Sequence, residues 1–196
     1  MSSKLGVQNI AHTNGTVAAT VASDGVVDFS ARPTGTSILG TQVNMASTAV
    51  QTWTSIPSTA NRITVFASDM SQTNNNINGA LTLRVGTGGS TQNTGYVCSS
   101  NYVSSASNAQ ALEDTTGFFT YFWSASNDRY GSFVLERMFE NIWICKGEFA
   151  ASSGSGVTVI TFGRVGLSGA LDTVSVGTYN GVLTHSSGQV NIKYES

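Results

Sequence analysis

Charged side chains are scarce in this sequence. Lys, Arg, Asp and Glu make up 10% of its 196 residues, whereas about 25% is usual in soluble domains. Nine basic residues stand against eleven acidic ones, so the net charge is only −2. A nucleic-acid-binding protein needs a basic patch or stripe, and the Lys and Arg residues here are scattered singly along the chain. We therefore expect no nucleic-acid partner.

Long apolar runs are absent as well. No window approaches the roughly 20 apolar residues that a membrane span requires. The first residues also lack the apolar core of a secretory signal. These absences predict a protein that is made in the cytoplasm and does not insert into a membrane.

Cysteine and histidine are too few to suggest metal or redox chemistry. Cys98 and Cys145 lie far apart and form no C-x-x-C motif, which predicts two free, buried thiols, with a disulfide as the alternative. His12 lies near the N-terminus and His185 in a Ser-rich segment, so both are expected on the solvated surface. We expect no metal site and no cofactor.

The sequence patterns of common catalytic sites are missing too. The nucleophile elbow G-x-S-x-G is absent, and the loop Gly86–Gly89 lacks the remainder of a dinucleotide or phosphate motif, so it predicts a turn between strands. Polysaccharide hydrolysis needs two carboxylates across the scissile bond, and no pattern marks such a pair. Glu113 and Asp114 are more typical of a turn than of a calcium site. We expect no catalytic residues and no enzyme activity.

Short neutral polar side chains take the place of charges. The chain contains 27 Ser, 24 Thr, 15 Asn and 21 Gly. A surface of this kind is soluble but lacks the like-charge repulsion that keeps monomers apart. The composition therefore indicates an oligomer or a component of a larger assembly.

Runs rich in Val, Ile, Thr and aromatic residues alternate with Gly, Ser and Asn clusters, as is typical of sandwiches and barrels. For example, Leu81, Leu83 and Val85 are expected to face the core, and the intervening Thr82 and Arg84 to face out. We predict an all-β protein whose head is an antiparallel, jelly-roll-like β-sandwich. The expected head strands are residues 49–54, 61–67, 80–85, 95–103, 118–123, 130–137, 141–146, 157–165, 171–176 and 189–195.

The composition changes near Pro33, which predicts an N-terminal arm of residues 1–33 and a head of residues 34–196. Two alternating apolar runs in the arm flank Asp24-Gly25, a dipeptide that favours a tight β-hairpin turn. A two-stranded hairpin is marginal in water by itself. The arm is therefore expected to dock on trimer mates or on a neighbouring protein.

An aromatic block within the expected strand 118–123 has large rings on both of its faces. Such a strand lies in the centre of a core or at a subunit interface, where Tyr and Trp are enriched. A carbohydrate-binding platform is the remaining alternative, since Tyr and Trp rings stack on sugars. The residues assigned to a core or a trimer interface are Phe118, Phe119, Tyr121, Phe122 and Trp123.

Three parts of the chain carry a resemblance to a known family. They are the opening segment 5–16 with Val26–Phe29, the middle segments Trp53–Pro57, Arg62–Val65, Leu83–Gly89 and Gly95-Tyr96, and the ending Gly188–Glu195. Together these segments resemble the small fibre proteins of tailed bacteriophages, especially those that infect marine and cyanobacterial hosts.

The resemblance implies a homotrimer of β-sandwich heads on the virion surface, mounted by the arm on a tail, portal-vertex or capsid protein. Little sequence is available for a shaft, which favours a short tail or head fibre that contributes to host attachment. One alternative is a decoration or cement protein that stabilises the capsid. Another is a carbohydrate-binding or polysaccharide-degrading module. The expected virion-anchoring residues are Val7, Ile10, Val17, Val21, Val27 and Phe29.

An attachment protein should carry exposed aromatic side chains beside Asn and Asp on its distal loops. A host surface glycan is the expected partner of such loops, whereas a cement protein needs no such pocket. The candidate receptor-binding residues are Asn74, Asn75, Asn76, Asn127, Asp128, Arg129 and Tyr130.

Overall fold

The computed structural model describes most of the chain, and the regular secondary structure of the described part is β-strand. No helix in this part is long and apolar enough to cross a membrane. The chain divides into two compact units, Met1–Thr36 and Ser37–Ser196, which we call the arm and the head. The described residues are 9–11, 17–21, 27–29, 37–72, 80–104, 107–120, 128–152, 156–179 and 181–196.

The arm contains a three-stranded antiparallel sheet. Its strands follow one another as β1 (Asn9–Ala11), β2 (Val17–Val21) and β3 (Val27–Phe29). The pairing of β2 with β3, in which Val21 lies opposite Val27, confirms the strand pairing expected around Asp24-Gly25. The turn itself lies outside the described residues.

The residues expected to anchor the arm fall on this sheet or beyond the described part of the chain. Val7 lies outside the described residues. The other five belong to the strands of the arm, where the Val21 side chain is half-buried and the remaining four side chains are not described. The anchoring role of all six stays a prediction. The five that lie on strands are Ile10, Val17, Val21, Val27 and Phe29.

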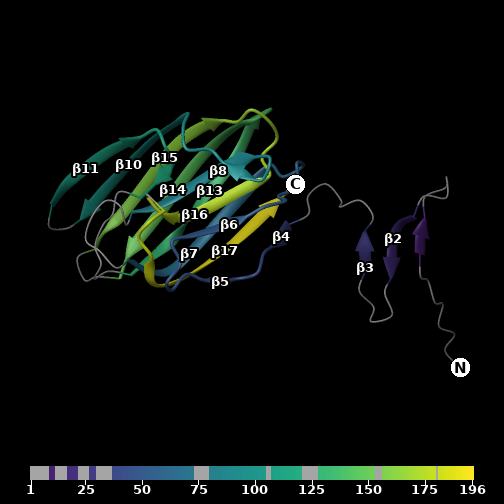
Figure 1. The fold of residues 1–196 in the computed structure, drawn as a ribbon, viewed down its shortest axis with the longest axis horizontal. Coiled ribbons are helices and arrows are strands. Elements are labelled where there is room, and N and C mark those ends of the chain that lie inside the picture. Colours follow the sequence, from purple (N-terminus) through teal and green to yellow (C-terminus); the bar gives the residue numbers. More distant parts are fainter. Residues whose placement is uncertain are drawn as a thin grey trace, which may run out of the picture. The chain divides into compact units, whose positions relative to one another are not determined.

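The head consists of two antiparallel sheets packed face to face (Figure 1). The larger sheet has nine strands, ordered β11 (Ser107–Asp114), β10 (Tyr96–Ser104), β15 (Thr158–Gly166), β14 (Ile142–Ala151), β13 (Arg129–Phe139), β7 (Arg62–Gln72), β17 (His185–Glu195) and β4 (Ser37–Leu39), with β5 (Val43–Asn44) also paired to β17. The smaller sheet has five strands, ordered β12 (Phe118–Phe119), β8 (Leu81–Thr87), β16 (Thr173–Thr178) and β6 (Val50–Trp53), with β9 (Ser90–Thr91) paired to β8.

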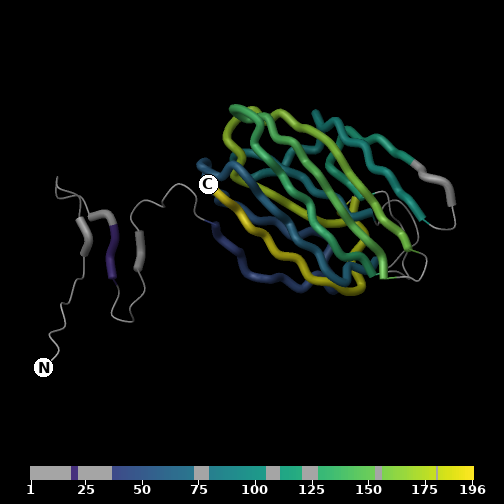
Figure 2. The backbone as a smooth tube through the Cα atoms, turned by 180° about the vertical axis from the view of Figure 1, so that it is seen from behind, coloured from purple at the N-terminus to yellow at the C-terminus, as the bar shows by residue number. Residues whose placement is uncertain are grey.

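Every expected head strand is present, although the strand expected over 118–123 is described only as β12. Strand β11 was not expected, because Asn, Gln, Asp and Ala are depleted in strands. It forms by pairing with the end of β10, so that Ser99 lies opposite Glu113. Figure 2, which views the head from behind, shows the breadth of the larger sheet to which β11 belongs.

The core lies between the two sheets and follows from the alternation of the strands. In β14, for example, Trp143, Cys145 and Phe149 are buried, while Ile144 and Lys146 are exposed. The larger sheet therefore has one apolar face packed on the smaller sheet. Within the head, no described strand covers its opposite face.

Tyr96 ties the two sheets together. It lies on β10 of the larger sheet, and its hydroxyl accepts a hydrogen bond from the Val85 amide of β8 at 2.9 Å. The same hydroxyl lies 3.1 Å from the Val85 carbonyl and 3.2 Å from that of Gln92. Its ring meets Phe118 of β12 edge to face, with centroids 5.0 Å apart. Burial raises the pKa of Tyr96 to about 12, so the phenol remains protonated.

The described part of the aromatic block belongs to the core. Phe118 and Phe119 are both buried, and Phe118 packs over Gly163 of β15, where a Cβ atom would lie 2.8 Å from its ring. Of the two alternatives for these residues, core or trimer interface, the head places them in the core. Tyr121, Phe122 and Trp123 lie outside the described residues.

The outer face of the smaller sheet is largely buried along β8 and β16, whereas Val50 and Thr52 of β6 are exposed. Leu81, Leu83 and Val85 face the core as expected, and Thr82 on the outer face is only 2% exposed. Gly117 lies beside it next to β12, and a Cβ atom there would lie 2.6 Å from the Thr82 methyl group. Thr82 is therefore buried although it lies on the outer face.

Arg84 on the same outer face is half-buried. Its guanidinium donates to the carbonyls of Thr116 at 2.9 Å and Tyr179 at 2.7 Å. These hydrogen bonds hold two segments from other parts of the chain over the outer face of the smaller sheet.

The two cysteines are free and buried, which confirms the expectation of two thiols. Burial raises the pKa of Cys98 to about 11 and that of Cys145 well above its usual value. Both side chains therefore act as small apolar groups of the core.

The tie made by Tyr96 leads to a stability prediction. Tyr96→Phe removes the hydroxyl that accepts from the buried Val85 amide, so the free energy of unfolding should fall by about 1–3 kcal/mol. Tyr130→Phe is the matched control, because that side chain is half exposed to solvent, and its effect should stay within about 0.5 kcal/mol. Urea unfolding of both variants measures the difference, and equal effects would contradict the role of Tyr96.

Candidate functional site

Strand β7 has one extra residue relative to β13 and also relative to β17. The two irregularities lie at the same position along β7. Between the pairs Ala67–Gly131 and Met70–Arg129, two residues of β7 lie opposite the single Tyr130 of β13. The register with β17 shifts at this level as well. Such bulges redirect side chains and are over-represented near active sites.

The conformations around the bulge fit this interpretation. Asp69 of β7 has a φ of 54°, which is uncommon for a residue other than glycine. Across from it on β17, Gly188 has a φ of 124°, and a Cβ atom there would lie 2.4 Å from the Met70 sulfur. Gly131 has a similar requirement, since its Cβ atom would lie 2.0 Å from the Glu148 carbonyl oxygen.

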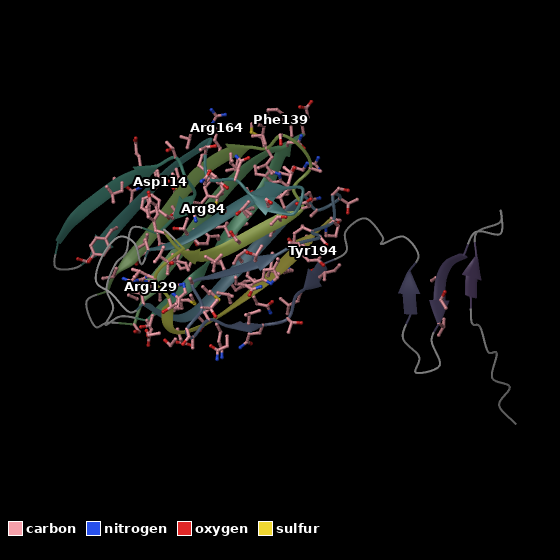
Figure 3. All side chains as sticks on the ribbon, in the orientation of Figure 1. Arg84, Asp114, Arg129, Phe139, Arg164 and Tyr194 are labelled. Carbon is pink, nitrogen blue, oxygen red and sulfur yellow. The ribbon has the colours of Figure 1, made fainter. Side chains whose placement is uncertain are left out.

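Two consecutive side chains of β13 have opposite environments at the bulge. Tyr130 is 50% exposed on the uncovered face of the larger sheet. Arg129 is 1% exposed and lies inside the head, near the end of the sandwich away from Phe139 and Tyr194 (Figure 3). Arg129 and Tyr130 thus point to opposite faces of the sheet, as successive residues of a strand do, and the bulge of β7 lies opposite Tyr130.

A hollow of about 360 Å³ lies on one side of Tyr130. A second exposed aromatic ring, Phe66 of β7, is part of its wall. No Lys, Arg, Asp or Glu belongs to its described lining, whose polar side-chain groups are three amides, one serine hydroxyl and the hydroxyl of Tyr130. The lining residues are Gln42, Phe66, Ala67, Ser68, Tyr130, Gly131, Gln189, Val190 and Asn191.

A second hollow of about 360 Å³ includes Tyr130 as well. Its described lining contains a single carboxylate, Glu148, whose oxygen lies 2.6 Å from the Lys146 ammonium group. Its remaining lining residues are Gly131, Phe149, Ala150, Thr158 and Ile160. Tyr130 therefore contributes to two neighbouring concave surfaces.

The linings can bind a neutral, hydroxyl-rich ligand. Aromatic rings offer apolar faces, and a Tyr hydroxyl adds a polar edge. The amides of Gln42, Gln189 and Asn191 supply both donors and acceptors, which suits sugar hydroxyl groups. The first hollow has no charged side chain in its described lining to select an ionic ligand.

Buried polar side chains lie at the end of the same three strands. Nδ1 of His185 lies 3.3 Å from the Ser71 carbonyl oxygen, and the pKa of His185 is lowered to about 4. Desolvation is the main cause, and the positive charge of Arg129 lowers this pKa further. Burial also lowers the pKa of Arg129. The side-chain amide of nearby Gln72, whose backbone pairs with His185, has no hydrogen-bond partner among the described residues.

Two sequence expectations are wrong here. His185 was expected on the solvated surface but is 1% exposed, because β17 begins at this residue and pairs it with Gln72. Arg129 was expected to contact a receptor, and its burial excludes it from a surface site. Both residues were assigned to loops, whereas they belong to strands.

The other candidate receptor-binding residues have mixed positions. Tyr130 is exposed, as an attachment residue requires, and Asp128 is half-buried with its carbonyl accepting from the Ser152 amide at 2.9 Å. Four candidates lie outside the described residues: Asn74, Asn75, Asn76 and Asn127.

The sequence analysis did not identify the partners of Tyr130 across the first hollow. Phe66 lies at an outward-facing position of an alternating strand. An aromatic residue at such a position was the signal in the sequence that could have identified it as part of a binding surface. Gln42, Gln189 and Asn191 come from distant parts of the chain and meet through strand pairing.

The glycine loop Gly86–Gly89 forms the turn between β8 and β9, as expected. Its amides bind a carboxylate of the chain itself, since Asp172 accepts from Gly88 at 2.8 Å and Gly89 at 3.2 Å. These bonds, together with the stronger one from the Thr173 hydroxyl, lower the pKa of Asp172. The carboxylate of Asp172 thus holds the loop in place.

Asp114 also has a structural role. Its carboxylate accepts from both the amide and the hydroxyl of Thr116, which is the turn geometry expected for this residue. In the described part of the chain, no group of three or more His, Cys, Asp or Glu side chains is placed to hold a metal ion.

Comparison of the sequence with protein-family models and with curated proteins finds no match. The function is therefore argued from the residues and their geometry. The exposed Tyr130 ring and the two hollows beside it form the described surface that is best suited to bind a ligand.

The buried His185 predicts a pH dependence of stability. The unfolded histidine, with a pKa of 6.5, takes up a proton as the pH falls, whereas the folded one does so only near pH 4. Stability is therefore retained above pH 6.5 and lost on acidification, by about 2.5 kcal/mol between about pH 7.5 and 4.5.

His185→Gln provides the control, because it removes this titration while keeping a polar side chain. Urea unfolding at the two pH values should show a smaller decrease in the free energy of unfolding for the variant than for the wild type. Equal decreases would contradict the contribution of His185.

Proposed function

We propose that this chain is a structural protein of a tailed-bacteriophage virion, a trimeric surface appendage that attaches to host glycans. Its arm mounts it on the particle and its head carries the glycan site. The observation that carries this proposal is the uncharged first hollow, in which Tyr130 and Phe66 combine with three amide side chains. The appendage is a short tail or head fibre with a jelly-roll-like head and no catalytic role.

The arrangement of the chain supports an appendage. The arm has its own three-stranded sheet and forms a compact unit separate from the head, which suits a segment that binds another virion protein. The low charge of the sequence also suits a multi-copy assembly. These features suit an appendage that is mounted by its arm and present in several copies.

The first alternative is a decoration or cement protein. Such a protein needs an arm shaped to neighbouring coat subunits but has no use for a ligand site. The bulge of β7 opposite Tyr130 requires an uncommon backbone conformation at Asp69, and bulges of this kind are commonly retained for function. This observation favours an attachment protein.

The second alternative is a polysaccharide-degrading module. Glycoside hydrolysis requires two carboxylates on either side of the bond. The described linings of the two hollows contain one, Glu148, and it is paired with Lys146. At these two hollows the residues therefore favour binding over cleavage.

A glycan-binding measurement tests the site. The full-length protein, applied to an array of neutral and acidic oligosaccharides, should bind neutral ones, and Tyr130→Ala should weaken this binding by about tenfold or more. Phe66→Ala should have a similar effect because its ring lines the same hollow.

Phe139→Ala is the matched control, since that ring is similarly exposed but belongs to neither hollow. It should bind as the wild type does, and all variants should melt within a few degrees of one another. Equal losses for Tyr130→Ala and Phe139→Ala, or wild-type binding to acidic oligosaccharides alone, would overturn the site.

Deletion of the arm tests the two-unit organisation. A chain of residues 37–196 should unfold cooperatively and retain the glycan binding of the full-length protein, because the core and both hollows lie within the head. It should fail to join particles assembled in cells that lack the full-length protein. Loss of folding would contradict an independent head, and incorporation without the arm would contradict its anchoring role.

A further inference from the structure

Tyr130 stands between the two hollows, which adjoin one another on the outer face of the larger sheet. Apart from Gln42, the lining of the first hollow comes from β17, β7 and β13. The lining of the second comes from β13, β14 and β15. Both linings include Tyr130 and Gly131, so the hollows meet at β13. We call the two hollows together the Tyr130 trough.

Strand register accounts for the concave surface on each side of Tyr130. Ala150 of β14 lies opposite Tyr130, and Thr158 of β15 lies opposite Ala150. On the other side of Tyr130, the lining of the first hollow includes Ser68 of β7. A large ring between small side chains leaves a hollow on both of its sides.

The next outward-facing row of the sheet supplies one wall of the trough. In this row Phe66 lies opposite Ser132, Ser132 opposite Glu148, and Glu148 opposite Ile160. Phe66 lines the first hollow and Ile160 lines the second, and both side chains are exposed. Each hollow therefore has an apolar wall of its own in addition to the shared Tyr130 ring.

The length of the trough exceeds that of a single sugar ring. It crosses β17, β7, β13, β14 and β15, which are adjacent in the sheet. At the usual spacing between strands, this distance is roughly 19 Å. A terminal sugar fills only part of it, whereas an extended chain of several sugar units contacts both hollows.

The distribution of charge favours a chain that crosses the strands. Glu148 in the second hollow is paired with Lys146 at 2.6 Å, and its carboxylate accepts hydrogen bonds from hydroxyl groups. A third hollow, of about 370 Å³, shares Glu148 and is lined by Arg62, Glu136 and Lys146 as well. A neutral chain along that course would remove water from these charged groups, which costs free energy.

We infer that the head binds an internal segment of an extended neutral glycan, which lies across the strands from β17 to β15 and over Tyr130. The glycan class rests on the proposed function. The second hollow and the direction of the chain are the additional elements. A site for a terminal sugar would use the first hollow and leave the second one empty.

Chain-length dependence of binding tests the inference. The full-length protein is titrated in a calorimeter with glucan, mannan and galactan oligomers, from disaccharides to octasaccharides. Affinity should rise with length until the trough is filled, by about tenfold or more over the disaccharide. Octasaccharides blocked at both ends should bind as the unblocked ones do, because neither end enters a hollow.

One variant in each hollow locates the sugar units. Ile160→Ala should remove most of the gain with length and leave disaccharide binding unchanged, whereas Phe66→Ala should weaken binding at every length. Ile144→Ala is the matched control, because it is the same substitution at an exposed residue that lines the third hollow but not the trough. It should bind every oligomer as the wild type does, and all three variants should melt near the wild-type temperature.

The outcomes separate this inference from the proposed function. Affinity that is independent of length, or lost when the ends are blocked, would overturn the extended chain and leave a terminal-sugar site in the first hollow. A gain with length that disappears in Ile144→Ala but persists in Ile160→Ala would overturn the course across the strands. Failure to bind any of the oligomers would overturn the extended-chain site, and the array of neutral oligosaccharides then shows whether the proposed glycan site falls with it.

Discussion

The close contact between the two sheets of the head is the constraint on which the other features depend. Tyr96 supplies a hydroxyl to the backbone of Val85 in the opposite sheet and a ring against Phe118. Phe118 in turn needs the missing side chain of Gly163 to approach the larger sheet. Thr161 adds a buried hydrogen bond of 2.8 Å from its hydroxyl to the carbonyl of Phe119. Together these contacts determine which face of the larger sheet is buried.

Burial of one face of the larger sheet leaves the other face for interactions. Near the bulge, the first hollow beside Tyr130 has no charged side chain in its described lining, which suits a sugar. The same alternation of strands that builds the core therefore also places Tyr130 and Phe66 on the exposed face of the sheet.

The strands of the head were predictable where alternation was strong. Leu81, Leu83 and Val85 were assigned to the core because each is separated from the next by one residue, and all three are buried. Thr82 and Arg84 lie on the outer face as predicted, but Thr82 is buried there, since alternation identifies the two faces of a strand but not whether the outer one is exposed to solvent. Strand β11 was missed because its sequence has little strand propensity and forms through pairing with β10.

The candidate site was predictable only in part. Tyr130 was identified by its aromatic ring beside Asn and Asp, yet Arg129 next to it is buried because both residues belong to strand β13, in which successive side chains point to opposite faces. The amides of Gln42, Gln189 and Asn191 could not be connected to Tyr130, because strand pairing between distant segments brings them together.

The sequence alone determined the all-β character, the strands of strong alternation, the low charge and the paired hairpin strands of the arm. These properties depend on neighbouring residues and on composition. Only the tertiary structure decided which sheet face is covered, where β7 gains its extra residue, and which side chains surround Tyr130. These properties depend on pairing and packing between residues far apart in the chain, which local periodicity does not encode.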